Sequence, residues 1–298
     1  MGPEYTGSSL KNKSIMRTTI IWAHLFLLIS IVLSAPKSKV ARFNVASYNL
    51  RMDTPRDSLD SWEHRKDMVN GLIRFHDFDI FGTQEGFHHQ ITDIIKPGDY
   101  AYTGVGRDDG KDAGEHSAII YKKNKFLVLD KGDFWFSETP EIPGKGWDAI
   151  CCNRICSWAK FKDIISGKEF YFFNVHYDHQ GKEARKQSSL LLMKKIRKIA
   201  AGYPVICTGD FNATPDSEPI KIINENGLLN DSYKVTLQPP YGTTGTSNSF
   251  NIFAKMKNRI DYIWISKEFT VNKYGVLNDV QYGHFPSDHF PVMINVSF

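Results

Sequence analysis

The chain has 298 residues, 41% of them hydrophobic and 13% aromatic, which is ample for a sizeable core and fits one globular domain. Its formal net charge is +4, so it lacks the strong basic bias of a dedicated nucleic-acid binder. The four cysteines, at positions 151, 152, 156 and 207, form no CxxC pair, which argues against a zinc site.

An apolar run from Ile20 to Leu33 is the first feature along the chain. It follows Arg17, and its length of about 14 residues fits the apolar part of a signal peptide but falls short of the roughly 20 residues of a membrane span. We therefore expect residues 1–35 to be a cleavable signal peptide, with Met16 a better natural start than Met1, and the mature protein to be periplasmic or secreted. An uncleaved membrane anchor is the alternative. Cleavage would remove three basic residues and one acidic residue, which lowers the net charge from +4 to +2.

Strands dominate the rest of the chain. Nine segments rich in β-branched and aromatic residues are predicted strands. They span residues 42–50, 78–84, 116–121, 126–136, 155–161, 170–177, 205–208, 260–265 and 291–298. Two helices with one apolar face are predicted over 62–76 and 184–199, and a short third helix follows Ser217. Many strands and few helices predict two β-sheets packed face to face, with helices on the outside.

Polar residues recur at the ends of these strands, where loops meet a sheet edge and functional sites are commonly built. Taken singly, Asn49 and Asn212 can cap turns, and His176 can be a core histidine. Glu85 and Asp261 are harder to explain in this way, because an unpaired carboxylate on a hydrophobic strand is costly to bury. Oxygen ligands and histidines without thiols suit a hard divalent cation such as Mg²⁺ or Mn²⁺. The residues concerned are Asn49, Glu85, His176, Asp210, Asn212, Asp261, Asp288 and His289.

These residues lie in six short motifs. The motifs are Ser47-Tyr48-Asn49, Thr83-Gln84-Glu85-Gly86, Asn174-Val175-His176, Gly209-Asp210-Phe211-Asn212, Arg259-Ile260-Asp261 and Ser287-Asp288-His289. In this order, from about Phe43 to Phe298, they resemble the endonuclease/exonuclease/phosphatase superfamily, which includes abasic-site endonucleases, DNase I, neutral sphingomyelinases and deadenylases. The resemblance implies an α+β fold of the DNase I type, a four-layer αββα sandwich of two mixed β-sheets with the active site at one edge. Residues 36–298 would form this catalytic domain.

The resemblance also implies a metal site. It makes Glu85 the principal ligand of Mg²⁺, with Mn²⁺ as the alternative ion. Asn49 lies beside it and contacts the metal or the phosphate, and Asp288 supplies a second metal contact. A cation suits the chemistry, because in-line attack on phosphorus concentrates negative charge on the equatorial and leaving oxygens.

Five further residues take catalytic roles by the same resemblance. Asp210 is the general base for the attacking water, and Asn212 holds that water or a phosphate oxygen. His176 donates to the phosphoryl oxygens. His289 stabilises the transition state, and Asp261 fixes its tautomer through a carboxylate-imidazole hydrogen bond. A positioned general base contributes about 10²–10⁴-fold to the rate.

Three features concern the substrate. Abasic-site endonucleases have a tyrosine where His176 stands, which argues against abasic-site repair. The segment 134–140, Phe-Trp-Phe-Ser-Glu-Thr-Pro, resembles a subgroup of bacterial secreted members. Arg154 and His116 are candidate substrate-binding residues, since an arginine can contact a phosphate bidentately, although Arg154 can equally anchor a loop.

The sequence thus predicts a metal-dependent hydrolase that cleaves a phosphate ester, with a phosphodiester favoured, by attack of an activated water. A secreted nuclease acting on DNA or RNA, and a non-catalytic binding module on the same fold, are the alternatives. The partner expected is a phosphorylated substrate, such as a nucleic acid or a lipid headgroup, and we expect a monomer without a stable protein partner. Export permits a disulfide among Cys151, Cys152 and Cys156, whereas Cys207 reads as a buried strand residue.

Overall fold

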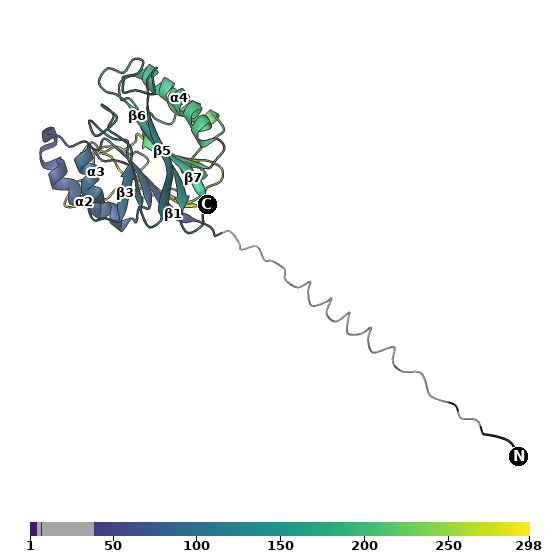
Figure 1. Ribbon diagram of the computed structural model, residues 1–298. Helices are drawn as coiled ribbons and strands as arrows, with labels where there is room; N and C mark the ends of the chain where they lie inside the picture. Colours follow the sequence, from purple (N-terminus) through teal and green to yellow (C-terminus); the bar gives the residue numbers. More distant parts are fainter. Residues whose placement is uncertain (5–6, 8–38) are drawn as a thin grey trace. The chain divides into compact units, whose positions relative to one another are not determined.

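Two six-stranded β-sheets form the centre of the protein in the computed structural model, which describes residues 1–4, 7 and 39–298 (Figure 1). The predicted signal peptide falls almost entirely outside the described residues. Residues 40–298 make one unit, and the description concerns this unit. Among the described residues, no helix has the length and apolar character needed to cross a membrane.

Each sheet is mixed, with a parallel pair of strands at its centre. The first sheet has the order β11 (Thr270–Val276), β12 (Val292–Ser297), β1 (Arg42–Asn49), β2 (Ile80–Gln84), β4 (Ile119–Lys122), β3 (Tyr100–Thr103). The second has the order β5 (Phe126–Trp135), β6 (Ile155–Asp163), β7 (Glu169–His176), β8 (Val205–Asp210), β10 (Asp261–Ile265), β9 (Asn230–Asp231). β1 pairs with β2 and β7 pairs with β8 in parallel, and all other neighbours are antiparallel.

Helices cover the outer face of each sheet. Buried side chains of α2 (Trp62–Phe75) and α3 (His88–Ile95) pack on the first sheet, and those of α4 (Lys182–Ala200) and α5 (Glu218–Glu225) pack on the second. A 3₁₀ helix, η1 (Pro55–Asp60), precedes α2, and a four-residue helix, α6 (Ser232–Val235), follows β9. The predicted four-layer αββα sandwich is therefore confirmed.

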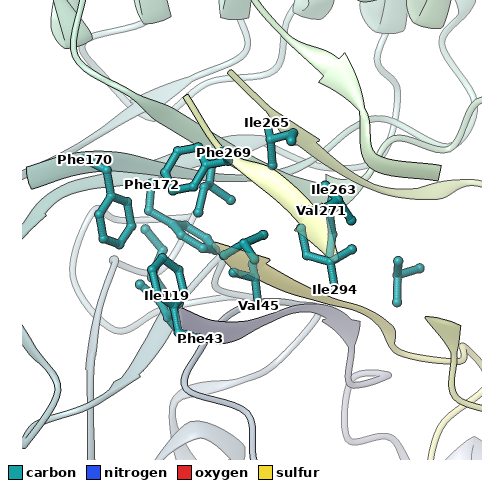
Figure 2. Packing of buried hydrophobic residues seen from close by; sticks show 14 of the residues in the cluster. Phe43, Val45, Ile119, Phe170, Phe172, Ile263, Ile265, Phe269, Val271 and Ile294 are labelled. Atoms are coloured by element: carbon teal, nitrogen blue, oxygen red, sulfur yellow. The ribbon is translucent and has the colours of Figure 1, made fainter. Parts of the chain in front are cut away.

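The inner faces of the sheets meet in an aromatic and aliphatic core. Phe43 of β1 stacks on Phe170 of β7 with ring centroids 5.5 Å apart, and both rings are at most 1% exposed. Figure 2 shows side chains from both sheets pointing toward one another, among them Val45, Ile263 and Ile294. Burial of such side chains contributes about 1.5–3 kcal/mol each and drives the sheets together.

Asn174 on β7 links the two sheets through polar contacts at the centre of this interface. Its Nδ2 donates to the carbonyls of Thr83 (2.8 Å) and Ala118 (3.0 Å), both of the first sheet. Its Oδ1 accepts from Gln84 Nε2 (2.7 Å) and from Thr208 Oγ1 (2.9 Å). Both polar atoms of the Asn174 side chain are paired, which fixes how the sheets sit against each other, because any slip leaves these groups unpaired.

All nine predicted strands and all three predicted helices are present, with ends that differ by up to three residues. The structure adds β3, β9, β11, η1, α3 and α6, which the sequence did not indicate. β9 is two residues long, and β11 contains Asn272, Lys273 and Gly275, which weaken its strand pattern. α3 has only eight residues, too few for a clear helical period.

Replacing Gly82 by alanine is expected to lower the free energy of unfolding by about 2–4 kcal/mol. A Cβ at this position would collide with Asn174 Oδ1 and Thr208 Oγ1 and force the sheets apart. The matched control is Gly71→Ala in α2, where a Cβ meets nothing within 4 Å and helix propensity should add about 0.5–1 kcal/mol. Urea unfolding of both variants measures the two effects, and an equal response of both would contradict the role of the Asn174 network.

Candidate active site

Strand direction brings the predicted site residues to one edge of the paired sheets. Parallel strands β1 and β2 end at this edge, and so do parallel strands β7 and β8, whose last residues, His176 and Asp210, pair directly. β10 runs antiparallel to β8, so its first residue, Asp261, lies opposite Asp210. β12 runs antiparallel to β1, which places the preceding segment 287–289 beside Asn49.

Three residues at this edge have left-handed backbone conformations although none is glycine. Their φ values are +57° for Arg51, +63° for Glu85 and +46° for Asn212. Such conformations cost about 1–3 kcal/mol each and cluster at functional sites. Local hydrogen bonds offset the cost, because Met52 N donates to Glu85 Oε2 (3.2 Å) and Asn212 N donates to Asp210 Oδ1 (2.9 Å).

Three carboxylates converge around one amide and one guanidinium. Asn49 Nδ2 lies 3.0 Å from Glu85 Oε1 and 3.1 Å from Asp210 Oδ2, so it donates to both acids. Arg51 Nη1 is 3.9 Å from Glu85 Oε2 and 3.9 Å from Asp288 Oδ2. The guanidinium is too far from either acid for a hydrogen bond, so the cluster is only partly neutralised.

Burial perturbs the titration of these acids. It raises the pKa of Asp210 to about 7, and the charge of Asp261 adds to this rise. Burial raises the pKa of Asp288 as well. Burial acts to raise the pKa of Glu85 too, but the charge of His289 and the Asn49 hydrogen bond outweigh it, so that this pKa is lowered. The raised values reflect the loss of hydration first and the neighbouring negative charges second, and a bound cation would relieve both.

His289 and Asp261 form a buried pair beside the cluster. His289 Nδ1 lies 2.9 Å from Asp261 Oδ2, which fixes the ring, and His289 Nε2 lies 3.9 Å from Asp210 Oδ2. Burial acts to lower the pKa of His289, but Asp261 and Asp210 outweigh it and hold the pKa well above its usual value. The neighbouring carboxylates thus favour the charged form of His289, whose second nitrogen is turned toward the acid cluster.

Arg154 and His176 form the cationic side of the site. Arg154 is 5% exposed, and its Nη1 contacts both ring nitrogens of His176 at 3.1 Å while Nη2 lies 2.8 Å from His179 Nδ1. Its nearest carboxylate is Asp178, at 3.4 Å from Nε. Burial and the neighbouring Arg154 lower the pKa of His176 well below its usual value, so this ring is neutral. A buried guanidinium with one long carboxylate contact retains capacity for an anion.

His116 lies deeper than the other predicted site residues. It is 1% exposed and lines a small closed space together with Arg107, Glu115, Arg154 and His176. Neither ring nitrogen has a hydrogen-bond partner within the described part of the chain. The structure thus places His116 behind Arg154, whereas Arg154 itself contacts His176 at the edge where the strands end.

Comparison with known proteins accounts for this arrangement. The model of the endonuclease/exonuclease/phosphatase family matches residues 46–289. The chain belongs to this family. It is 45% identical to a family member from Bacteroides thetaiotaomicron. The match covers 88% of this chain and 96% of that one, and the TM-score is 0.84. It is 46% identical to a mannosyl-6-phosphatase from Bacteroides thetaiotaomicron VPI-5482, over 86% of this chain and 100% of that one, with a TM-score of 0.82.

More distant relatives of this endonuclease/exonuclease/phosphatase domain include nucleases. The chain is 24% identical to the CCR4-Not complex 3'-5'-exoribonuclease subunit Ccr4 of Emericella nidulans over 80% of its own length. It spans about half the length of that subunit, 48%. A phosphatase and an exoribonuclease share the cleavage of a phosphate ester, and this chain is accordingly a hydrolase of phosphate esters, a phosphoesterase in the general sense.

The family generally uses a divalent metal, and the acid cluster fits one. Single ligand atoms of Glu85, His176 and Asp210 lie within 4.8 Å of one another. Asp288 lies 3.9 Å from the Arg51 guanidinium, which is also 3.9 Å from Glu85. The available donors are carboxylate, amide and imidazole groups without a thiol, which suits a hard cation. The under-neutralised carboxylates are the observation that favours a metal here.

Arg65 was not among the residues predicted from sequence, although it holds the site together. From α2, its guanidinium donates to the carbonyls of Leu50, Arg51 (2.7 Å) and Pro286 (3.1 Å). It therefore ties the loop after β1 to the loop that carries Asp288. The signal was available, because position 65 shares the buried face of α2 and a charged residue on such a face needs several partners.

An ion pair between Arg107 and Glu115, which was not predicted from sequence, lies beside His176. Arg107 Nη1 donates to Glu115 Oε2 at 2.6 Å, and the same oxygen lies 3.7 Å from His176 Nδ1. Burial raises the pKa of Glu115 to about 7 against the opposing effect of Arg107.

The cysteine pairing is now defined as well, since Cys151 and Cys152 form a disulfide while Cys156 is a buried free thiol.

Replacing Arg65 by methionine is expected to lower the free energy of unfolding by about 2–4 kcal/mol, because buried carbonyls of two site loops lose their donor. The matched control is Arg74→Met on the same helix, where the lost ion pair with Asp99 is exposed and is worth less than about 1 kcal/mol. Urea unfolding measures both variants. Equal effects of the two substitutions would contradict the role assigned to Arg65.

Proposed function

We propose that this chain is a Mg²⁺-dependent phosphomonoesterase that removes the phosphate from a hexose 6-phosphate, with mannose as the sugar. The observation that carries the proposal is the 46% identity to a mannosyl-6-phosphatase whose whole length the chain covers. The chain retains each acid, amide and histidine that the chemistry needs at the strand edge. The proposal departs from the phosphodiester favoured by the sequence alone.

The charge of the site supports a monoester. A monoester phosphate has two ionisable oxygens, whereas a phosphodiester has one. Arg154 offers a buried guanidinium with a single carboxylate at 3.4 Å. Arg51, by contrast, is already held by Asp57 at 2.8 Å and adds only its long-range charge, 3.9 Å from two acids. A buried, incompletely paired guanidinium beside a metal site suits a doubly charged anion. The near-neutral domain charge, by contrast, does not favour a long polyanion.

Glu85, Asn49 and Asp288 are the residues that would hold Mg²⁺, with Mn²⁺ as the alternative ion. When bound, the cation would neutralise charge on the phosphoryl oxygens and act as a Lewis acid. The remaining steps belong to the protein. Asp210 Oδ1 is fixed by Asn212 N at 2.9 Å and Oδ2 by Asn49 Nδ2 at 3.1 Å, so the carboxylate is held ready to accept a proton from water.

Hydrogen-bond donors on two sides of the acid cluster would stabilise the negative charge that develops on the phosphoryl group. His289, fixed by Asp261, directs Nε2 toward Asp210 and would stabilise the transition state and the leaving oxygen. His176 and Arg154, in contact at 3.1 Å, would hold the phosphoryl oxygens from the other side. Because these groups are buried and already positioned, they reorganise little during the reaction.

We also propose that the protein is exported and acts as a monomer. Support for export comes from the apolar run Ile20–Leu33 and its flanking residues in the sequence. The Cys151–Cys152 disulfide fits the same proposal, because disulfides persist in oxidising compartments. The substrate would then be a phosphorylated sugar or glycan met outside the cytoplasm.

The protein is expected to release phosphate from mannose 6-phosphate with Mg²⁺ present and to lose this activity in EDTA. Asp210→Asn should lower kcat by about 10²–10⁴-fold, because the general base is removed. The matched control is Asp109→Asn, an exposed aspartate in a surface turn, which should leave kcat unchanged. Release of p-nitrophenol from bis-p-nitrophenyl phosphate and of nucleotides from poly(A), measured in parallel with phosphate release from mannose 6-phosphate, tests the substrate class. Faster turnover of either diester would contradict the monoester proposal and favour the nuclease alternative.

A further inference from the structure

One loop beside the cationic side of the site has no role in the chemistry described. It contains residues 147–152 and ends in the Cys151–Cys152 disulfide. The sulfur of Cys151 lies within 4.8 Å of ligand atoms of Asp178 and His179. Those two residues contact Arg154, at 3.4 Å and 2.8 Å. The disulfide is therefore one side chain away from the guanidinium proposed to bind the phosphate.

The loop is firmly anchored to its surroundings. Asp148 accepts from the backbone N–H groups of Ala184 (2.6 Å) and Glu183 (3.1 Å) at the start of α4. Lys145 Nζ donates to the carbonyl of Ile150 at 2.7 Å. A disulfide between adjacent residues closes a small ring, which restricts the backbone of the loop further. A surface held in this way loses little entropy when it binds a ligand.

The anchored loop presents apolar groups to solvent at this position. The side chain of Ile150 is 73% exposed, and Cys151 is exposed beside it. His179 is exposed as well, and because its Nδ1 contacts Arg154, its Nε2 is the ring nitrogen that can bind a hydroxyl group. Anchored apolar groups beside one polar group can contact both the apolar face and a hydroxyl group of a small ligand.

We infer that Ile150 and the Cys151–Cys152 disulfide form the subsite for the leaving group and contact the apolar C–H face of a hexose ring. The occupant follows from continuity with the site, since a phosphate bound at Arg154 directs its ester oxygen and sugar away from the buried guanidinium. His179 then binds a sugar hydroxyl. This inference rests on the proposed function and adds the residues that select the sugar.

The test compares two substrates in three variants of the full chain. Mannose 6-phosphate carries a ring that the loop can contact, and glycerol 2-phosphate carries a leaving group too small to do so. Ile150→Ser and Cys151→Ser/Cys152→Ser remove the two halves of the subsite. Ile165→Ser is the matched control, because Ile165 is 67% exposed and lies in the turn between β6 and β7, at the opposite end of these strands.

The ratio of kcat/KM for mannose 6-phosphate to kcat/KM for glycerol 2-phosphate should fall about fivefold to tenfold in Ile150→Ser and in the double cysteine variant, mainly through KM for the sugar. The ratio should stay unchanged in Ile165→Ser. An unchanged ratio in both loop variants, or an equal loss on both substrates, would overturn the subsite. A parent protein that cleaves glycerol 2-phosphate but not mannose 6-phosphate would instead overturn the proposed function, and the hexose occupant with it.

Discussion

The structure depends on the concentration of three carboxylates, Glu85, Asp210 and Asp288, at one buried edge. Loss of hydration and repulsion between neighbouring acids oppose folding, as the raised pKa of Asp210, about 7, reflects. The fold opposes this repulsion with Asn49, whose amide donates to two of the acids, and with Arg51 at 3.9 Å from two of them. The compensation is incomplete, and the same shortfall makes the edge a cation and phosphate site. The capacity to bind a cation and the cost of folding this edge therefore have one physical origin.

The two sheets make this concentration possible. Each contributes a parallel pair whose carboxyl ends reach the same edge, and Asn174 keeps the pairs aligned through bonds to both sheets. Arg65 performs the same task for the loops, since it holds the segment after β1 and the segment before β12 through their carbonyls. Hydrogen bonds to main-chain carbonyls leave the positive charge of Arg65 free to act on the acids nearby. The site is thus positioned by groups that never touch the substrate.

Sequence reasoning predicted the layers and the residues at the strand ends, because both are recorded in local patterns. Apolar strands that end in Glu85 or Asp210 are visible in a single chain, and their order allowed the family to be recognised. Arg65 and the Arg107–Glu115 pair were missed because their partners lie far away in sequence. The depth of His116 was equally hidden, since burial depends on how Gly86 pairs with it across a loop. The loop at Ile150 has no periodic pattern, and only its tertiary anchors show that it is held beside the site.

The most direct test of the account is a crystal structure with Mn²⁺ and inorganic phosphate, in which anomalous scattering locates the metal. The account predicts a metal peak within bonding distance of Glu85 and a phosphate in contact with Arg154 and His176. Both ions should lie at the edge where the parallel pairs end. A metal bound elsewhere, or a phosphate that contacts none of these residues, would contradict the claim that the under-neutralised carboxylates form the catalytic centre.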